Sequence, residues 1–351
     1  MKYTMSNFWQ DKKVFLTGHT GFKGSWLSLW LQELGVEVCG YALAPNTDPN
    51  LFTLANVADN MQSIIADIRD LEKLQAAVAQ FKPDIILHLA AQALVRYSYA
   101  NPVETYATNV MGTVNILEAA RNCNSVKVVV NVTTDKCYEN KEWVWGYRET
   151  EPMGGHDPYS NSKACSELVT SAYRNSFFKE AEIALASARA GNVIGGGDWS
   201  QDRLIPDIIK SLIAEQKPQI RHPNAIRPWQ HVLEPLSGYL MLAEQCWHHP
   251  QEFSEAWNFG PHLQEAVPVR KIVEQVLAEW GSATGWDDVS GKVPHEANYL
   301  KLDIAKAMSQ LHWHPKFNLQ EALNLTLDWY KAWQNGEAIR ALTLQQIHNF
   351  K

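Results

Sequence analysis

The sequence has no long apolar run and no excess of basic charge. Its longest apolar-looking stretch, residues 24–40, is interrupted by Gln32, Glu33 and Glu37 and is too short to span a bilayer. The amino-terminal segment also lacks the apolar core of a secretory signal peptide. A net charge of −7 argues against a nucleic-acid or anionic-membrane surface. We therefore expect neither a membrane nor a nucleic acid as a partner.

Cysteine is also scarce. The five cysteines are odd in number and form no CxxC pair, which predicts a reducing, cytoplasmic compartment and no structural zinc. The histidines at 248–249 and in "HWH" at 312–314 could be metal ligands. No carboxylates accompany them at ligand spacing, so surface or interface histidines are the more economical interpretation, and we expect no metal.

Apolar, strand-like segments alternate with helix-period segments in the first half of the chain. This alternation predicts an α/β fold with a doubly wound parallel sheet covered by helices on both faces. The predicted strands are residues 13–18, 36–43, 61–67, 84–91, 126–134 and 182–189.

After about residue 195, Gly and Pro punctuate the chain and helical patterns dominate, near 204–216, 232–247, 268–280 and 320–334. We expect a dinucleotide-binding domain over residues 1–190, with part of 228–260 interleaved. Residues 191–351 are expected to form mainly a smaller, mostly helical substrate-binding lobe.

A glycine-rich turn follows the first predicted strand. Gly18, Gly21 and Gly24 form the pattern GxxGxxG and precede an amphipathic helix. Such a turn lets the backbone approach a pyrophosphate at the helix N-terminus, although a tight turn without a ligand has the same pattern. No acid or arginine ends the second strand at "GYALAP", so this position does not choose between NAD and NADP. Asp67 is placed to contact an adenine ring or to cap the helix that begins near Arg69.

Two further groups carry chemistry. Tyr159 and Lys163 are four residues apart and share one helical face, where a lysine would lower the pKa of the phenol and let it act as a base. Thr134, Asp135 and Lys136 stand at the carboxyl end of the fifth predicted strand, where ligands of parallel sheets bind. Either group alone occurs by chance, and it is their order behind a glycine turn that gives them weight.

Together these motifs resemble the short-chain dehydrogenase/reductase superfamily, in its extended branch that modifies nucleotide sugars. The resemblance covers essentially the whole chain and includes "HLAAQ" (88–92), "TNVMGT" (108–113), "TTDK" (133–136), "ARAGNVIGGGDW" (188–199) and "RPWQHV" (227–232). Within the branch, the glycine turn, "TTDKCYEN" and "GNVIGGGDW" are most similar to the 4,6-dehydratases that act on CDP-glucose in bacterial 3,6-dideoxyhexose pathways.

The resemblance implies an NAD cofactor and a nucleotide-sugar substrate. It places Thr17, Gly18, Gly21, Phe22 and Gly24 at the pyrophosphate, Asp67 and Ile68 at the adenosine, and Ala90 beside the cofactor. Tyr159 would be the base at the sugar 4-hydroxyl, Lys163 would tune it and bind the nicotinamide ribose, and Thr134 would bind the sugar. Candidates for the substrate's phosphates and base are Asn192, Arg203, Arg227 and Tyr299, each of which could equally be a surface or lobe-packing residue.

The implied reaction oxidises C4, eliminates water across C5 and C6, and returns the hydride to C6. Asp135 would protonate the departing hydroxyl, for which it must itself be protonated. Better-known relatives carry Glu as the C5 base where this chain has Lys136. Lys136 must be neutral to accept a proton, or it stabilises the developing enolate while another group takes the proton. The sequence leaves both roles open.

Two other functions fit parts of the pattern. A nucleotide-sugar 4-epimerase shares the turn, the tyrosine and the lysine but has no use for an Asp–Lys pair. A non-catalytic dinucleotide-binding protein would need none of these side chains. The helical segments 102–122 and 158–178 are expected to pair with their copies in a homodimer or dimer of dimers, as the family commonly does.

Overall fold

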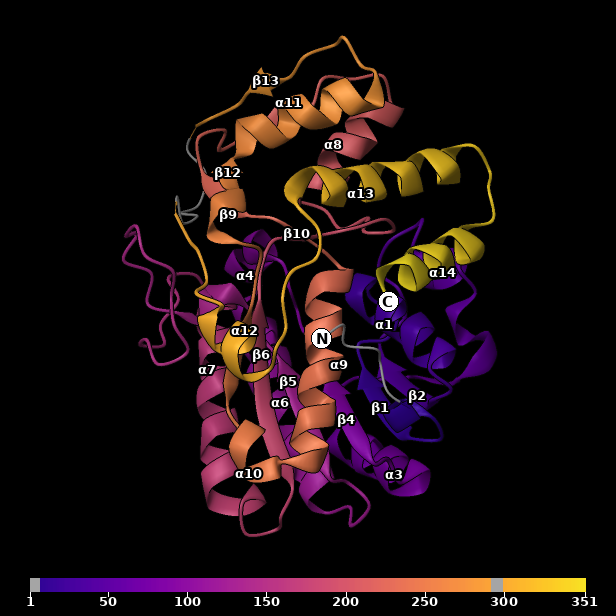
Figure 1. Ribbon diagram of the computed structural model, residues 1–351, viewed down its shortest axis with the longest axis vertical. Helices are drawn as coiled ribbons and strands as arrows, with labels where there is room; N and C mark the ends of the chain where they lie inside the picture. The colour runs from indigo at the N-terminus through magenta and orange to yellow at the C-terminus, as the bar shows by residue number, and fades with distance from the viewer. Residues whose placement is uncertain (1–6, 292–298) are drawn as a thin grey trace.

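The centre of the molecule is one sheet of seven parallel strands. The computed structural model describes residues 7–291 and 299–351. The strands lie in the order β11-β6-β5-β4-β1-β2-β3 (Figure 1). Their bounds are β1 Lys13–Thr17, β2 Glu37–Ala42, β3 Gln62–Ile65, β4 Ile85–His88, β5 Val128–Val132, β6 Ala184–Ala190 and β11 Ala256–Phe259. The predicted doubly wound parallel sheet is therefore confirmed.

The prediction of six strands was one short. β11 is only four residues long and pairs with β6 in the register Ala256↔Ser187 to Phe259↔Ala190. A four-residue strand carries little periodic signal, and its partner lies about seventy positions earlier, so only tertiary pairing identifies it. The second half of the chain thus adds a strand to the sheet, and this strand lies within residues 228–260.

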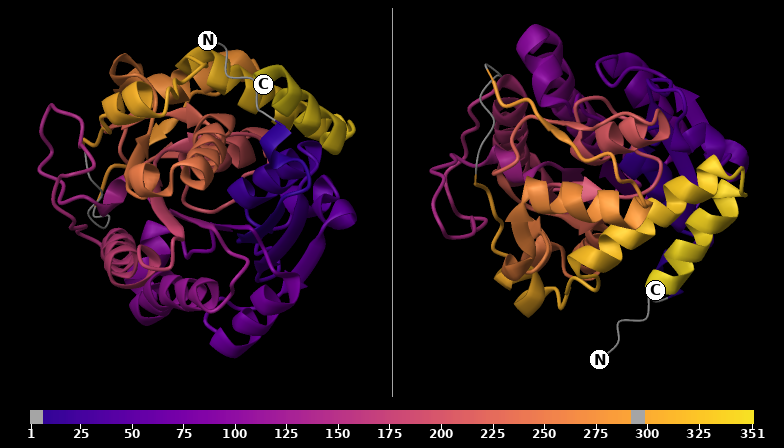
Figure 2. Two further views of the ribbon diagram at one scale, coloured as in Figure 1. Left: turned by 60° about the horizontal axis from the view of Figure 1, so that its bottom comes forward. Right: turned by 90° about the horizontal axis from the view of Figure 1, so that it is seen from above.

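Helices cover both faces of the sheet because successive strand residues point to opposite sides. Val14 and Leu16 of β1 join one buried core, whereas Phe15 between them joins the other. Figure 2 shows helices on both sides of the sheet. Buried side chains of α1 and α9 join one core and those of α3 and α6 join the other, and α7 packs beside α6. The bounds of these helices are α1 Phe22–Glu33, α3 Leu71–Phe81, α6 Gly112–Arg121, α7 Pro158–Tyr173 and α9 Leu233–His248.

A smaller lobe lies beyond the carboxyl ends of the strands, at the top of Figure 1. Its main helices are α8 Leu204–Ile213, α11 Val269–Trp280 and α13 Leu319–Gln334. Three two-stranded sheets join them: β10 Gln230–His231 with β7 Val193–Ile194, β12 Ala266–Pro268 with β9 Ile226–Pro228, and β13 Asp287–Asp288 with β8 Gln219–Ile220. The remaining helices are α2 Leu51–Leu54, α4 Val95–Ala100, α5 Pro102–Tyr106, α10 Pro250–Phe253, α12 Ala305–Gln310 and α14 Ile339–Phe350.

The last helix ties the end of the chain to its beginning. Phe350 of α14 packs edge-on against Trp30 of α1, with ring centroids 5.6 Å apart. Arg340 donates to the carbonyls of Ala55 and Asn56. The second half of the sequence therefore contributes α9, β11 and α14 to the body built around the sheet. Among the residues described, no helix is both long and apolar enough to cross a membrane.

The strand order reverses direction between β1 and β4, which lie side by side in the register Val14↔Ile85 to Thr17↔His88. Connections leave these two neighbours toward opposite edges of the sheet. Such a switch point leaves a crevice at the carboxyl ends, where ligands of doubly wound sheets bind.

Candidate active site

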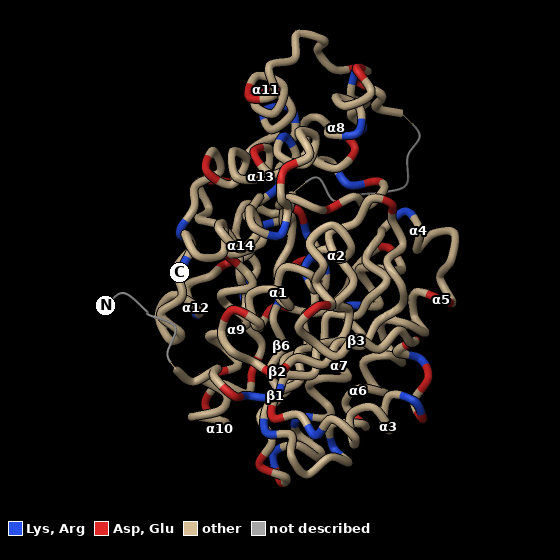
Figure 3. The backbone as a smooth tube through the Cα atoms, turned by 90° about the vertical axis from the view of Figure 1, so that its right-hand side faces the viewer, with Lys and Arg blue, Asp and Glu red and all other residues tan. Residues whose placement is uncertain are grey.

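Two adjoining cavities open at the carboxyl ends of the strands. The smaller, of about 590 Å³, is lined by the glycine turn and by the residues that follow β2, β3 and β4. The larger, of about 750 Å³, lies between the ends of β5 and β6 and the lobe helix α8. Charged residues of both signs gather where the lobe meets the sheet, near α4 and α8 (Figure 3). Tyr159, Lys23 and Arg203 line both cavities, so the two form one continuous site.

The glycine turn fits a pyrophosphate. Gly18 has φ +79°, and a Cβ on it would lie 2.8 Å from the backbone nitrogen of Ala90. Helix α1 then begins at Phe22, and its N-cap residue Gly21 offers the first turn no side-chain hydrogen bond. Gly18, Gly21, Phe22 and Gly24 all line the smaller cavity. The unpaired N–H groups and positive end of the helix dipole therefore suit the phosphates of a dinucleotide.

Thr17 lies behind this turn and not in the cavity. It is fully buried, and its hydroxyl accepts hydrogen bonds from the backbone N–H groups of Leu89 and Ala90, both at 3.1 Å. It also bonds to His88 Nδ1 at 2.7 Å. The Thr17 side chain therefore fixes the end of β1 to the end of β4, and the expected contact of Thr17 with the pyrophosphate stays a prediction.

Asp67 and Ile68 line the far end of the smaller cavity. The Asp67 carboxylate accepts from the Arg69 backbone N–H at 2.9 Å and from its guanidinium. These hydrogen bonds to Arg69 lower the pKa of Asp67. The alternative role of Asp67 as a helix cap is wrong in detail, because α3 begins at Leu71 and is capped by Asp70. Ala90 also lines this cavity, as the resemblance implies.

Helix α7 carries Tyr159 and Lys163 on one face. Its start is well specified, because Pro158 occupies the first turn and the Asp157 side chain caps the helix by accepting from the backbone N–H of Ser160 at 2.9 Å. Lys163 Nζ donates to the carbonyl of Val132, at the end of β5, at 3.0 Å. The pair therefore stands beside the carboxyl end of β5.

The predicted lowering of the Tyr159 pKa is wrong for this structure. Burial raises the pKa of Tyr159 to about 12, although a hydrogen bond with Thr134 and the charge of Arg203 act in the opposite direction. Burial also lowers the pKa of Lys163 to about 8, against the charges of Glu167 and Cys137, which raise it. Desolvation of the phenol therefore outweighs the favourable effects of Thr134 and Arg203 on its pKa.

The Asp135–Lys136 pair enters the larger cavity directly after β5. Thr134 caps the short 3-10 helix η4 (Asp135–Cys137). Asp135 is fully buried and accepts from Thr134 Oγ1 at 3.0 Å and from Asn192 Nδ2 at 3.3 Å. Lys136 Nζ lies 4.0 Å from Asp135 Oδ1, and its side chain is 19% exposed. A buried acid and a partly exposed amine therefore share the cavity that Tyr159 also lines.

Three of the four substrate candidates meet in this cavity. Asn192, Arg203 and Arg227 line it, and Arg203 Nη1 forms an ion pair with Asp198 at 2.9 Å. Tyr299 does not join them: its backbone bridges to Ile226, and Lys301 Nζ stacks on its ring at 4.8 Å.

The sequence interpretation missed Lys23, Arg96 and Arg221, which also line the larger cavity. Burial, together with the charges of Arg203 and Lys163, lowers the pKa of Lys23 to about 7. Its place inside the glycine turn was a usable signal, because that turn faces the ligand edge of the sheet. Arg96 and Arg221 both pair with Asp202 at 2.6 Å, a contact between distant segments that no local pattern reveals.

The arrangement suits proton transfer beside a dinucleotide cavity. A phenol, a carboxyl and an amine line one polar cavity with several cations that can bind phosphate. In residues 7–291 and 299–351, no group of three or more His, Cys, Asp or Glu is arranged to hold a metal ion.

Comparisons with known proteins agree with this geometry. The profile of the family described as GDP-mannose 4,6 dehydratase matches residues 15–326. CDP-glucose 4,6-dehydratase of Salmonella typhimurium is 56% identical over 98% of this chain and 97% of its own length. dTDP-glucose 4,6-dehydratase of Neisseria meningitidis is 27% identical over 92% of this chain and 96% of its own.

Solved structures share the fold. UDP-glucose 4-epimerase of Thermotoga maritima superposes with a TM-score of 0.81 at 22% identity, over 92% of this chain and 99% of that one. dTDP-glucose 4,6-dehydratase of Bacillus anthracis gives 0.77 at 23% identity, over 94% and 99%. With the dinucleotide turn, the Tyr–Lys helix and the acid–amine pair in one site, the chain belongs to the GDP-mannose 4,6 dehydratase family, within the extended short-chain dehydrogenase/reductases.

Proposed function

We propose that the chain is an NAD-dependent CDP-glucose 4,6-dehydratase, a hydro-lyase that converts CDP-D-glucose to CDP-4-keto-6-deoxy-D-glucose and water. The observation that carries the proposal is that Tyr159, Asp135 and Lys136 line one cavity, which continues into the cavity of the glycine turn. The choice of CDP-glucose rests on the 56% identity to a CDP-glucose 4,6-dehydratase.

The cofactor residues in this proposal are Gly18, Gly21, Phe22, Gly24, Asp67, Ile68, Ala90, Tyr159 and Lys163, all of which line the smaller cavity. Bound NAD would take up the hydride from C4 of the sugar and return it to C6 within one catalytic cycle. The chain's own residues move the protons. Tyr159 takes the proton of the 4-hydroxyl as a phenolate, which the charge of Arg203 favours. Lys163 is proposed to tune Tyr159 and to bind the nicotinamide ribose.

Elimination needs an acid and a base on neighbouring carbons. The 4-ketone acidifies the C5 proton, and removal of that proton with loss of the C6 hydroxyl releases water. Asp135, buried next to Thr134, is the proposed acid at the departing hydroxyl. Lys136 either takes the C5 proton as a neutral amine or stabilises the enolate as a cation. Its Nζ lies 4.0 Å from Asp135 Oδ1, which supports a role at the carbon next to the one whose hydroxyl Asp135 would protonate.

Substrate binding follows from the cations of the larger cavity. Arg203 and Arg227 are proposed to hold the diphosphate, because guanidinium groups bind phosphate through paired hydrogen bonds. Asn192 is proposed to bind the sugar beside Asp135, which its amide already contacts. The contact of Tyr299 with the substrate stays a prediction, because Tyr299 does not line the cavity.

The test is to incubate the purified protein with CDP-glucose and NAD and to analyse the product. We expect a 4-keto-6-deoxy sugar, detected by its alkali-induced ultraviolet absorbance and by one solvent deuterium at C5. A stable galactose isomer would instead identify a 4-epimerase, and no conversion would indicate a non-catalytic dinucleotide-binding protein.

We further propose a homodimer built on α5, the π-helix η3 (Ala107–Met111) and α7. Large apolar side chains on these elements are exposed, including Val103 at 81% and Leu168 at 58%. Such faces on the consecutive segments α5 and η3 and on the long helix α7 suit pairing with their copies as a four-helix interface. Leu168→Glu should give a monomer by light scattering, whereas Val144→Glu, at a site 71% exposed outside these helices, should not. Unchanged mass in both variants would rule out this interface.

The five free cysteines also support a reducing cytoplasm as the working compartment. We also propose a place in O-antigen lipopolysaccharide biosynthesis, which the product supports because 4-keto-6-deoxy sugar nucleotides are precursors of dideoxysugars.

A further inference from the structure

A third charged residue stands behind Tyr159 and Lys163 on the same face of α7. Glu167 follows Lys163 by four residues, as Lys163 follows Tyr159, so all three share one stripe of the helix. Glu167 is buried, with a side chain only 4% exposed, and does not line either cavity. It therefore does not touch the substrate, and its role has to run through its neighbours.

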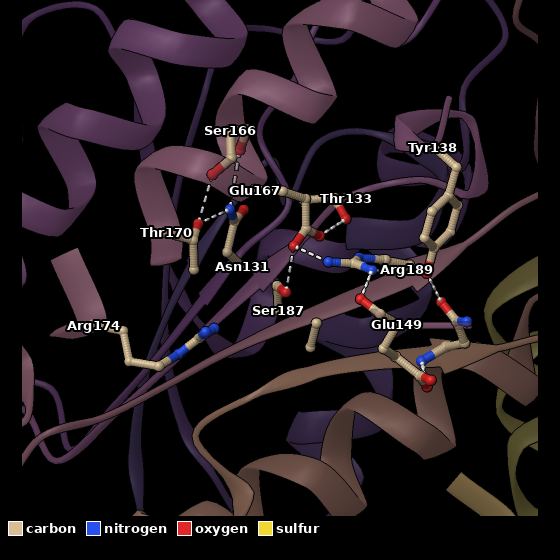
Figure 4. Close-up of polar contacts among 12 residues, drawn as sticks. Asn131, Thr133, Tyr138, Glu149, Ser166, Glu167, Thr170, Arg174, Ser187 and Arg189 are labelled. Carbon is tan, nitrogen blue, oxygen red and sulfur yellow. Dashed lines mark hydrogen bonds and ion pairs between the residues drawn. The ribbon is translucent and has the colours of Figure 1, made fainter. Parts of the chain in front are cut away.

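Glu167 joins α7 to the carboxyl ends of two strands (Figure 4). Its Oε1 accepts a hydrogen bond from Thr133 Oγ1, one residue before Thr134. Its Oε2 accepts from Ser187 Oγ at 2.7 Å and from Arg189 Nη2 at 2.8 Å, both on β6. One carboxylate thus connects the Tyr159–Lys163 helix to the turn that carries Asp135 and to the strand that leads to Asn192.

Arg189 anchors this carboxylate to the far edge of the sheet. Its Nη1 donates to the Tyr138 hydroxyl at 2.7 Å and to the Glu149 carbonyl at 3.0 Å. The Tyr138 hydroxyl in turn donates to Asn258 of β11 at 2.7 Å. Buried ion pairs contribute little net stability, because desolvation offsets their attraction. A network that joins four elements behind the catalytic side chains is better explained by the geometry that it imposes.

Glu167 also supplies a negative charge behind Lys163. Burial raises the pKa of Glu167, but the charge and hydrogen bonds of Arg189, with those of Thr133 and Ser187, leave it lowered, so the carboxylate is ionised. The titratable groups that face Lys163 are Tyr159 and Glu167 on α7, Cys137 on η4, Lys23 on α1 and His88 on β4. Arg189 and Arg174 face Glu167. Glu167 is therefore the carboxylate that favours the protonated lysine.

We propose that Glu167 is a positioning residue of the dehydratase: it fixes the turn bearing Thr134 and Asp135 relative to Tyr159 and keeps Lys163 a cation. The proposal rests on the proposed function for its catalytic meaning. Its two parts are separable, because the contact with Thr133 fixes the turn and the charge alone acts on Lys163.

The charge is tested with Glu167→Gln, which keeps the shape of the side chain. Without the carboxylate, Lys163 should lose its proton at lower pH. We expect its titration, followed by NMR of the lysine Cε and assigned with Lys163→Met, to move down by ~1 pH unit or more. The basic limb of kcat for C4 oxidation should move down with it. Glu234→Gln is the matched control, a buried carboxyl in α9 that lines neither cavity.

The contact with the turn is tested with Thr133→Val, using Thr133→Ser as the control that keeps the hydroxyl. Amide hydrogen exchange over residues 133–138 should accelerate in Thr133→Val, but not in Thr133→Ser or in Glu234→Gln. Product formation should fall in Thr133→Val by about tenfold or more while the Lys163 titration stays in place.

These readouts separate the possible failures. If the wild type makes no 4-keto-6-deoxy product, the proposed function fails, whereas the NMR titration and amide exchange still test Glu167. If Lys163 titrates at the same pH in Glu167→Gln as in Glu234→Gln, and exchange in the turn is unchanged in Thr133→Val, the positioning role is overturned. A change in pH profile that Glu234→Gln shares would equally overturn it.

Discussion

Gly191 lies directly against Asp135: a Cβ built on Gly191 would come within 2.0 Å of the Asp135 carboxylate. The glycine at the end of β6 therefore creates the space that the proposed acid occupies after β5. We predict that Gly191→Ala displaces Asp135 and slows product formation by about a hundredfold, because the C6 hydroxyl loses its proton donor. C4 oxidation should persist, so reduced cofactor should accumulate and be visible by its absorbance.

Gly260→Ala provides the control, since the nearest atom to a Cβ on Gly260 is a side-chain carbon of Ile304 at 3.6 Å. Equal product rates in Gly191→Ala and Gly260→Ala would contradict a role for Asp135 in elimination.

Lys136 is predicted to act on C5 and not on C4. Its Nζ lies 4.0 Å from Asp135 Oδ1, whereas it is Lys163 that is tied to the end of β5 behind Tyr159. Lys136→Ala should therefore reduce deuterium uptake at C5 by about 10²- to 10⁴-fold and leave C4 oxidation nearly unchanged. NMR of the sugar recovered from deuterium oxide measures the first, and single-turnover cofactor reduction the second. Intact C5 exchange would exclude Lys136 both as the base and as the enolate stabiliser.

The sequence predicts the elements of this site better than their contacts. The first strand, expected at 13–18, spans Lys13–Thr17, and the spacing of Tyr159 and Lys163 does put them on one helix face. Both follow from local patterns. The clearance between Gly191 and Asp135 and the desolvation of Tyr159 depend on packing between distant segments. No spacing rule contains that information.

Thr17 shows the same limit at the cofactor cavity. Its position beside the glycine turn suggests a phosphate contact. Its hydroxyl instead accepts hydrogen bonds from the backbone N–H groups of Leu89 and Ala90, directly after β4. Lys23 is the converse case, because a residue inside the turn reaches both cavities. Which side chain faces the ligand is decided by the neighbouring strand and lobe, which the local sequence does not show.

Thr134 is predicted to set the pH dependence of C4 oxidation. Burial raises the pKa of Tyr159 to about 12, and the hydrogen bond with Thr134 opposes that rise. Thr134→Val removes this bond, so the phenolate should form only at higher pH. The acid limb of kcat/KM for C4 oxidation should move upward, with a roughly tenfold loss of rate at pH 7. Thr134→Ser, which retains the hydroxyl, should keep the wild-type profile; a profile in Thr134→Val that matches it would refute this assignment.

Glu234 is predicted to make the stability of the fold depend on pH away from the active site. This carboxyl of α9 is 1% exposed and accepts the backbone N–H groups of Lys316 and Phe317 at 2.8 and 2.7 Å. Burial raises its pKa from 4.5 to about 7, although these hydrogen bonds act against the rise. The folded state therefore holds a proton that the unfolded state releases between these two values.

This difference in bound protons decides how the free energy of unfolding changes with pH. Below pH 4.5 both states are protonated, and as the pH rises toward 7 the unfolded state gains by ionising, so the free energy of unfolding falls. Glu234→Gln cannot ionise and should lack this slope. Relative to wild type, its free energy of unfolding should rise by roughly 2–3 kcal/mol between pH 4.5 and 8. Urea unfolding at several pH values measures the difference, and parallel curves for the two proteins would show that Glu234 is already ionised in the folded state.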